Sequence, residues 1–396
     1  MLRVSRLEIP RTSCGVAASA ALLLGACAPG QSVSAHPSSA PASLGTASSS
    51  APEAATASSH FEAVFDLPDD RIRAISSSGE LVIAVAQSTY LRSTDRGRTF
   101  QKAAIPQPNP MSIAVVSDHL VYLGSQRRGL ARSLDGGQTF QALSAPSPYA
   151  FSAIDSIVIG PDQSLWIANN PETSVWRSTD RGATFSGKPL DDAPAWATVV
   201  KASQDEAVLF GQDAKMEPFM AAVDAKGTKL RALPLLAGAK YETVCASKGS
   251  LFASTDRGIL RAKEGASTWL PVLAKSDSSV LSCSEQAIVV ANMGPLRPLH
   301  PETISVEVST SRDLGETWTK DSFDAPVHWQ SGVDLGAKWT PGAPPPTSAS
   351  PKLPRIGAVF VAGTGETYVG LTDVVPGTKV EGMPQLYGSR LYRRGH

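Results

Sequence analysis

The sequence predicts an all-β protein built from repeated small sheets. One short motif recurs at regular intervals along the chain, and runs rich in β-branched and aromatic residues precede its copies, as in Leu81–Ala86 and Leu120–Gly124. Hardly any stretch shows the 3.6-residue period of an amphipathic helix. Because self-similarity at a fixed period is the signature of a repeat architecture, we expect each copy to mark one structural unit.

The recurring motif has the form Ser-x-Asp-x-Gly-x-Thr followed by an aromatic residue. Full copies begin at Ser93, Ser133, Ser178 and Ser311, and a degenerate copy begins at Ala262. An Asp carboxylate can accept N–H groups of its own turn, and Gly supplies the positive φ that a tight turn requires. The motif therefore predicts a hairpin turn between two strands. Its acidic and glycine positions, which we interpret as structural and not catalytic, are Asp95, Gly97, Asp135, Gly137, Asp180, Gly182, Glu264, Asp313 and Gly315.

This pattern resembles the Asp-box, or BNR repeat, of sialidases, sortilin-type receptors, xyloglucanase-type glycosidases and the photosystem II assembly factor. The resemblance covers residues 61–396. It implies that these residues form a single β-propeller, a ring of four-stranded sheets called blades. Because unrelated activities share this fold, the function must be argued from a site and not from the repeat.

The spacing of the motif gives the number of blades. The copies begin at residues 93, 133, 178, 262 and 311. Their steps are about 40–50 residues, which is the size of one propeller blade, except that the step from 178 to 262 is twice as long. A worn copy around Asp224 fits midway through that step. We therefore predict seven four-stranded blades, whereas a different reading of the worn copies would give six or eight.

The two ends of the repeat region predict how the ring closes. The last unit supplies three strands, at residues 356–362, 367–371 and 389–393, and the chain then stops. The segment His60–Phe65 precedes the first complete blade and looks like a strand that follows an Asp-box. We expect this N-terminal strand to complete the last blade, since closure removes the free sheet edges.

The first 26 residues have the form of a bacterial lipoprotein signal peptide. Arg3, Arg6 and Arg11 precede an apolar run over Gly15–Ala26, which is too short to span a bilayer. The sequence Leu-Gly-Ala-Cys at residues 24–27 resembles a lipobox, which implies lipidation of Cys27; ordinary secretion is the alternative. Ala28 follows this cysteine in place of an aspartate. We therefore expect a lipid-anchored protein of the cell envelope, at the outer membrane.

Residues 27–60 form a segment of a different composition. Ala, Ser, Pro, Gly and Thr make up nearly all of it, so it cannot bury enough apolar surface to fold, and we expect a disordered tether. The whole chain has 36 basic and 36 acidic residues. This balance does not favour a nucleic-acid partner.

An enzyme function has one partial candidate residue. Sialidases carry an Arg-Ile-Pro signature on the first strand, and Arg71-Ile72-Arg73 stands at the matching place, with the proline replaced. The chain leaves no room for the expected loop before the first Asp-box, and we find no convincing Tyr/Glu pair. We expect a non-catalytic binding or scaffold protein that presents a propeller face to a protein or glycan; the alternative is a sialidase-like glycoside hydrolase.

Metal and cofactor sites are not predicted. The histidines at residues 60, 119, 299, 328 and 396 fall at no ligand spacing, and no phosphate-binding glycine loop precedes a helix. Cys245 and Cys283 occupy equivalent positions in neighbouring blades, so a disulfide is possible outside the cytoplasm. Two buried, reduced cysteines are the alternative.

Three segments depart from the repeat. Two are predicted insertions, at Met293–Glu302 and from about Asp324 to Pro354, and they could form a contact surface or disordered decoration. The second insertion contains His328, Trp329, Trp339 and a proline cluster at 344–346. The third segment, the basic stretch Gln126–Gly129, could meet an acidic partner or form a solvated turn.

Overall fold

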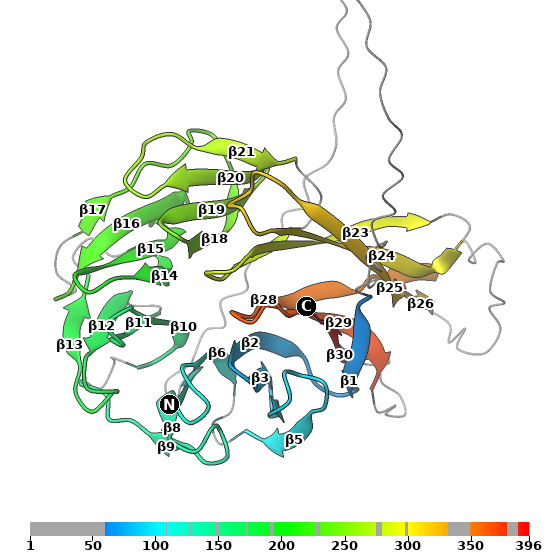
Figure 1. The fold of residues 1–396 in the computed structure, drawn as a ribbon, viewed down its shortest axis with the longest axis horizontal. Coiled ribbons are helices and arrows are strands. Elements are labelled where there is room, and N and C mark those ends of the chain that lie inside the picture. The colour runs from blue at the N-terminus through cyan, green and yellow to red at the C-terminus, as the bar shows by residue number, and fades with distance from the viewer. Residues whose placement is uncertain are drawn as a thin grey trace, which may run out of the picture. The chain divides into compact units, whose positions relative to one another are not determined.

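The computed structural model describes residues 60–395, with gaps at 106, 108, 127, 147–150, 171–172, 191–193, 227–229, 275–278, 298–299, 332–348 and 378–386. The predicted signal peptide, Cys27 and all of the predicted tether except His60 lie outside these residues. The described part forms seven four-stranded antiparallel sheets arranged in a ring, as Figure 1 shows. The prediction of an all-β propeller with seven blades is confirmed.

The blades follow one another in chain order, and each begins with its innermost strand. Blade 1 comprises β2 (Ile72–Ser78), β3 (Leu81–Ala86), β4 (Thr89–Ser93) and β5 (Gln101–Ala104). Blade 2 comprises β6 (Pro110–Val115), β7 (Val121–Ser125), β8 (Gly129–Ser133) and β9 (Gln141–Ala142). Blade 3 comprises β10 (Ile154–Ile159), β11 (Leu165–Asn169), β12 (Ser174–Ser178) and β13 (Ser186–Pro189).

The next three blades keep the same order. Blade 4 comprises β14 (Trp196–Ala202), β15 (Glu206–Gln212), β16 (Pro218–Asp224) and β17 (Leu230–Ala232). Blade 5 comprises β18 (Tyr241–Ser247), β19 (Ser250–Thr255), β20 (Gly258–Lys263) and β21 (Leu270–Leu273). Blade 6 comprises β22 (Val280–Cys283), β23 (Ile288–Arg297), β24 (His300–Ser311) and β25 (Thr319–Pro326).

Blade 7 is assembled from both ends of the described chain. Its first three strands are β28 (Arg355–Val361), β29 (Thr367–Pro376) and β30 (Tyr387–Arg394). The fourth is β1 (Glu62–Leu67), which pairs antiparallel with β30 from Glu62–Arg393 to Leu67–Ser389. Figure 1 shows β1 beside β30. The predicted closure by the N-terminal strand is therefore confirmed.

Apolar packing between neighbouring sheets forms the core. Because each blade is covered on both faces, its second strand reads as a continuous apolar run, and all six residues of β3 are buried. Ile83 and Val85 of β3 pack with Ile113 and Leu123 of blade 2, and similar clusters join other blades. The core is thus a series of inter-sheet layers around the ring.

The Ser-x-Asp-x-Gly-x-Thr motif forms the turn between the third and fourth strands. In blade 2, Ser133 Oγ donates a hydrogen bond to Asp135 Oδ1 over 2.7 Å and accepts one from the Gly137 N–H over 2.7 Å. Thr139 donates from its Oγ1 to Asp135 Oδ2 over 2.6 Å. The same contacts recur in blades 1, 3 and 6. The motif therefore satisfies its own polar groups within one turn.

These hydrogen bonds hold two successive residues in the left-handed region. Their φ values are 58° and 72° for Arg96 and Gly97, and 70° and 86° for Gly136 and Gly137. The glycine also permits close packing, since a Cβ on Gly137 would lie 2.7 Å from Cδ1 of Ile83 in blade 1. A side chain at this position would meet both backbone strain and the neighbouring blade.

The carbonyl exposed by this turn binds an arginine of the preceding blade. Arg92 Nε of blade 1 donates to the Gly136 carbonyl of blade 2 over 2.7 Å, and Arg132 Nη1 of blade 2 donates to the Arg181 carbonyl of blade 3 over 2.8 Å. Two further pairs are Arg261 Nη1 to the Leu314 carbonyl, at 2.7 Å, and Arg393 Nε to the Arg96 carbonyl, at 2.6 Å. Each full motif thus accepts one arginine from a third strand. We call this contact the blade clasp.

The degenerate copy in blade 5, whose acidic residue is Glu264, forms a different turn. Its turn is a shorter one, in which the Ala266 N–H donates to the Lys263 carbonyl over 2.9 Å. The Glu264 carboxylate pairs with Lys201 on β14 of blade 4. Because Ala266 stands where the full copies have glycine, the left-handed pair of the full motif does not form here.

Deletion of β1 tests ring closure. Removing residues 61–66 should leave β30 with an unpaired edge and lower the melting temperature of the whole domain, because blade 7 loses its fourth strand. Removing residues 28–58, which lie outside the described sheets, serves as the control and should leave the melting temperature unchanged. Circular dichroism during heating measures both deletions, and equal melting temperatures would contradict closure by β1.

Acid titration tests the motif carboxylates. Partial burial raises the pKa of Asp135, but hydrogen bonds from Thr139 and Ser133 outweigh it and lower the pKa from 3.8 to about 2. The ionised carboxylate therefore stabilises the fold above about pH 4, and this stabilisation is lost as the pH falls through about 2. The Asp135→Ala variant should be less stable than wild type at pH 7, with the difference shrinking between pH 4 and 2.

The measurement is the midpoint of urea unfolding as a function of pH. Asp205→Ala removes an exposed acidic side chain and serves as the control, which should follow the wild-type curve. A constant difference between wild type and Asp135→Ala from pH 7 to pH 2 would contradict the lowered pKa.

Candidate functional site

The first strands of the blades enclose the axis of the ring. Each first strand contacts the first strand of the next blade, all the way around, and Figure 1 shows these strands innermost. All of them begin at the same end of the ring, which we call the mouth. Because the strands of a blade alternate in direction, the motif turns lie at the opposite end, far from the mouth.

The first strands carry a repeated irregularity at the mouth. Five of them have a register shift next to their second residue. The inserted residues are Arg73, Met111, Asp155, Glu242 and Gly357. Bulges re-aim side chains and are common beside functional sites. The chemistry of the mouth therefore varies from blade to blade on a constant frame.

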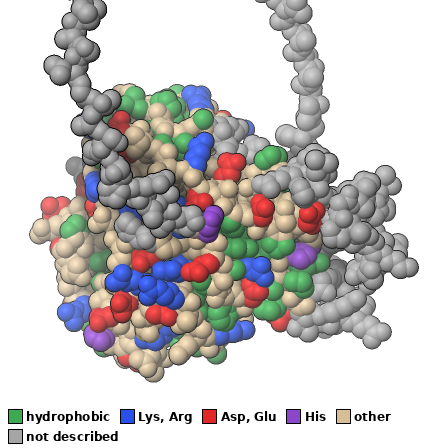
Figure 2. Space-filling model, turned by 45° about the vertical axis from the view of Figure 1, so that its right-hand side comes forward, with side chains coloured by type: hydrophobic (Ala, Val, Ile, Leu, Met, Phe, Trp, Pro, Cys, Tyr) green, Lys and Arg blue, Asp and Glu red, His purple; other side chains and the backbone are tan. Residues whose placement is uncertain are grey.

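Charge is distributed unequally around the mouth. Arg71 and Arg73 of blade 1 and Arg355 of blade 7 lie in neighbouring blades, whereas Asp155 belongs to blade 3 and Glu242 to blade 5. The arginines define a basic arc over blades 7 and 1, which also contains Asp70 and Asp373, and the carboxylates define an acidic arc over blades 3 and 5. On the face of the molecule that Figure 2 shows, acidic and basic side chains are interspersed.

A pocket of about 480 Å³ opens between these arcs, at blades 5, 6 and 7. Glu242 and Arg355 bring opposite charges to it, and both are exposed. Thr243 places a buried Oγ1 that has no hydrogen-bond partner in its wall. The remaining lining residues are Ser279, Val280, Met293, Pro354 and Ile356. An apolar wall with a few convergent polar groups is the usual composition of a binding pocket.

Two carboxylates near the mouth, those of Asp155 and Asp70, have different environments. Burial raises the pKa of Asp155, although Asn170 Nδ2 donates a hydrogen bond to it over 2.7 Å. Burial acts in the same direction on Asp70, but hydrogen bonds from Ser88 and Thr89 outweigh it, and the pKa of Asp70 is lowered. Asp70 thus fastens the loop at the start of blade 1, whereas the proton affinity of Asp155 is raised.

Arg71, the residue that matches the sialidase signature, lies at the mouth and forms an ion pair. Arg71 Nη2 contacts Asp373 Oδ1 of blade 7 over 3.2 Å. Arg73 reaches the other way, and its Nη1 lies 3.3 Å from Met111 Sδ of blade 2. Because the two guanidinium groups point to opposite neighbours, they do not form a clamp for one substrate carboxylate.

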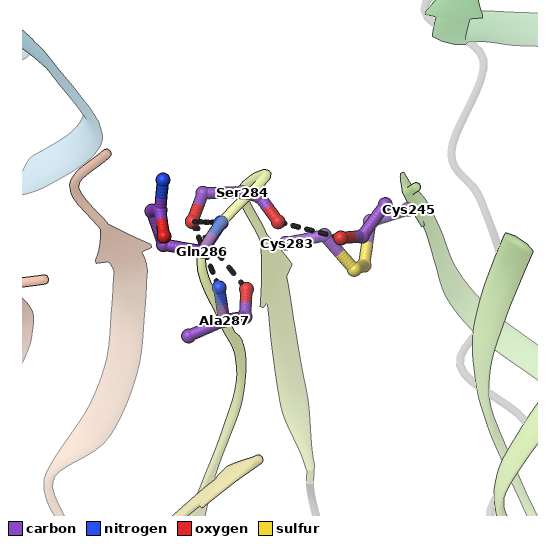
Figure 3. The surroundings of a disulfide bond; sticks show 6 residues. Cys245, Cys283, Ser284, Gln286 and Ala287 are labelled. Carbon is purple, nitrogen blue, oxygen red and sulfur yellow. Dashed lines mark hydrogen bonds between the residues drawn. A yellow bond between two sulfur atoms is a disulfide. The ribbon is translucent and has the colours of Figure 1, made fainter. Parts of the chain in front are cut away.

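Cys245 and Cys283 are joined by a disulfide, with their Cα atoms 5.7 Å apart. Figure 3 shows how it connects β18 of blade 5 to β22 of blade 6. Ser247 Oγ donates to the Ser284 carbonyl beside it, over 2.7 Å. The same two strands contribute Thr243 and Val280 to the mouth pocket, so the disulfide fixes the spacing of that wall.

The described parts of the two predicted insertions contain strands, so these parts are not disordered decoration. The first insertion extends the hairpin of β23 and β24, which pair as far as Arg297 and His300. The second begins within β25 and continues as a hairpin of β26 (His328–Ser331) and β27 (Ala349–Lys352). Trp339 and the proline cluster at 344–346 lie outside the described residues.

His328 and the basic stretch have local structural contacts. The His328 ring stacks on Tyr387 with centroids 4.3 Å apart, and its Nε2 lies 3.0 Å from the Val374 carbonyl. In the basic stretch, Gln126 forms a β-bridge with Ala153 of blade 3 and Gly129 begins β8, while Arg127 lies outside the described residues.

The described residues contain no group of three or more His, Cys, Asp or Glu side chains arranged to hold a metal ion. Within the same part of the chain, no helix has the length and apolar character needed to cross a membrane.

Sequence reasoning missed the mouth pocket and the blade clasp. A signal for the clasp exists, because arginine occupies the same repeat position at residues 92, 132, 177, 261 and 393. Arg177 faces blade 4, which lacks a full motif, and its Nη2 instead contacts Asp162 Oδ2 over 2.7 Å. The pocket left no comparable signal, because its lining comes from three separate blades.

Comparison with known proteins identifies the fold and not a family. No family model matches the chain, and no curated protein matches it. Among solved structures, it is similar to YCF48 bound to D1 peptide, with a TM-score of 0.52 and 12% identity over 85% of this chain and 95% of that one. It is also similar to streptogramin B lyase, with a TM-score of 0.51 and 13% identity over 85% and 97% of the two chains.

A third similar structure is the WD40 β-propeller domain of Doa1, with a TM-score of 0.53 and 11% identity over 84% of this chain and 97% of that one. A peptide complex and a lyase are thus both among the structures similar to this chain. At these sequence identities the likeness concerns the fold alone. The chain is a seven-bladed β-propeller.

Proposed function

We propose that this protein is a non-catalytic binding lipoprotein of the bacterial cell envelope, whose propeller mouth holds an extended segment of another protein. The observation that carries the proposal is the pocket of about 480 Å³ between the charged arcs of the mouth. Glu242 and Arg355 offer opposite charges across an apolar wall that includes Val280 and Met293. A polypeptide supplies both charges and apolar side chains along one extended backbone.

Two considerations favour a peptide over a glycan or a substrate for hydrolysis. Among the described residues that line the pocket there is no aromatic side chain, whereas sugar rings commonly stack on aromatic faces. Arg71 and Arg73 diverge and so do not supply the carboxylate clamp of a sialidase-like enzyme. YCF48, in complex with D1 peptide, is an example of a similar fold that binds a peptide.

The cellular setting belongs to the same proposal. Cys27 follows a short apolar run and precedes a segment of Ala, Ser and Pro, which together resemble a lipoprotein export signal and tether. Lipidation at this cysteine would attach the protein to the outer membrane. We also assign the propeller to the Asp-box repeat family, because its turns carry the Ser-x-Asp-x-Gly-x-Thr motif. The disulfide of Cys245 and Cys283 is compatible with an oxidising compartment.

Charge reversal at the mouth tests the binding proposal. The purified protein is screened against a phage-displayed peptide library and against immobilised glycans. We expect peptides to be enriched, and Arg355→Glu and Glu242→Lys each to weaken their binding at least about tenfold, a loss of roughly 1.4 kcal/mol. Lys102→Glu on the outer strand β5 is the matched control and should bind as wild type does.

Enrichment of glycans alone, or unchanged peptide binding by both mouth variants, would contradict the proposal. Release of the fluorophore from a fluorogenic sialoside by the wild-type protein would favour the glycoside hydrolase instead.

Replacement of the proposed lipidated residue tests the anchor. In the bacterium, Cys27→Ser should prevent incorporation of a radiolabelled fatty acid and move the protein out of the detergent phase in Triton X-114 partitioning. Wild type should partition into the detergent phase, because an acylated chain carries a large apolar surface. Normal acylation of the variant would show that Cys27 is not the anchor.

A further inference from the structure

A second pocket lies between blades 4 and 5, at the end of the ring that carries the motif turns. Its volume is about 220 Å³. Val208, Met220, Leu251 and Trp269 form apolar walls, and each of them is buried. Glu206 and Glu264 stand among the charged residues that line it. This pocket is separate from the mouth and shares none of the residues that line the mouth pocket.

The pocket lies beside the second and third strands of blade 4, where this blade differs from the blades that form a clasp. On the sheets that form a clasp, the third-strand arginine pairs across the strands with a larger side chain, as in Tyr122–Arg132 and Tyr368–Arg393. In blade 4 the equivalent pair is Val208–Ala222, so both side chains are small. The turn of blade 5 that faces this pair is the shorter turn of the degenerate motif copy. The missing arginine and the shortened turn together leave the space open.

The chemistry of the pocket fits one aromatic ring. An apolar cavity of roughly 150 Å³ can hold a benzene-sized molecule, so about 220 Å³ accommodates a ring with a small substituent. The Trp269 Nε1–H is already satisfied by the Pro234 carbonyl at 3.0 Å, which leaves the wall apolar. At the rim, Arg231 Nη2 contacts Glu206 Oε2 over 3.1 Å, and Lys201 pairs with Glu264.

We propose that the pocket between blades 4 and 5 is a binding site for a small aromatic molecule, whose ring enters between Val208 and Trp269 and whose polar substituent stays at the charged rim. The site is independent of peptide binding at the mouth.

Methionine-methyl NMR tests the proposal on the full-length protein. Met220 lines this pocket and Met293 lines the mouth pocket, so one spectrum of methyl-¹³C-methionine protein reports on both. Titration with indole should move the Met220 methyl signal in a saturable way, because an aromatic ring shifts nearby nuclei. The Met293 signal should stay in place. An unmoved Met220 signal, or equal shifts of both signals, would overturn the proposal.

A second titration distinguishes the source of the ring. N-acetyltryptophanamide carries the same indole on a polypeptide backbone, and we expect it to require at least about tenfold higher concentration than free indole. Tighter binding of N-acetyltryptophanamide would overturn the assignment to a small molecule. Val208→Phe should fill the pocket and weaken indole binding at least about tenfold, and unchanged affinity would contradict the site. If this variant does not fold, the titrations of the native protein still decide.

Discussion

The blade clasp is the polar interaction that joins neighbouring blades at four boundaries of the ring. Within each motif turn, Ser, Asp and Thr side chains satisfy one another and hold two residues at positive φ. This conformation turns a main-chain carbonyl towards the preceding blade, where an arginine such as Arg92 donates to it. A charged donor makes such a bond stronger than a neutral one. The motif therefore connects blades, and its acidic residue acts through the turn that it stabilises.

Two of the boundaries without a clasp flank blade 4. Blade 4 has Ala222 at the arginine position, and the pocket between blades 4 and 5 opens there. Arg177 faces blade 4 and turns back to Asp162 of its own blade. Between blades 5 and 6, the clasp of Arg261 is joined by the disulfide of Cys245 and Cys283 near the axis. The two strands that the disulfide joins also line part of the mouth pocket. A fixed spacing between these strands lowers the conformational entropy that binding costs.

The sequence predicted the fold well because the determinants of a propeller are local and repeated. Motif spacing gave the seven blades, and the incomplete last unit gave the closure by β1. Glu264 shows the limit of this reasoning, because its position resembles that of Asp95 but Ala266 cannot replace the glycine of the turn. The strands within the two insertions are not predictable from their proline-rich sequences, because strand pairing depends on a partner strand.

The candidate site was less predictable for a physical reason. The mouth pocket gathers Glu242, Val280 and Arg355 from three blades, and no spacing along the chain marks such residues as neighbours. Arg71 was singled out from a motif, yet its role depends on Asp373, which lies in the opposite half of the sequence. Closure of the ring brings these residues together, so their contacts appear only in the folded chain.

A double-mutant cycle between Arg92 and Asp135 tests most directly whether the motif turn and the arginine act as one unit. The free energy of unfolding is measured by urea for wild type, Arg92→Ala, Asp135→Ala and the double variant. We predict that the double variant is less destabilised than the sum of the single variants, with a coupling of about 0.5–3 kcal/mol, because Asp135 holds the turn whose carbonyl binds Arg92. Additivity within about 0.3–0.5 kcal/mol would contradict the account.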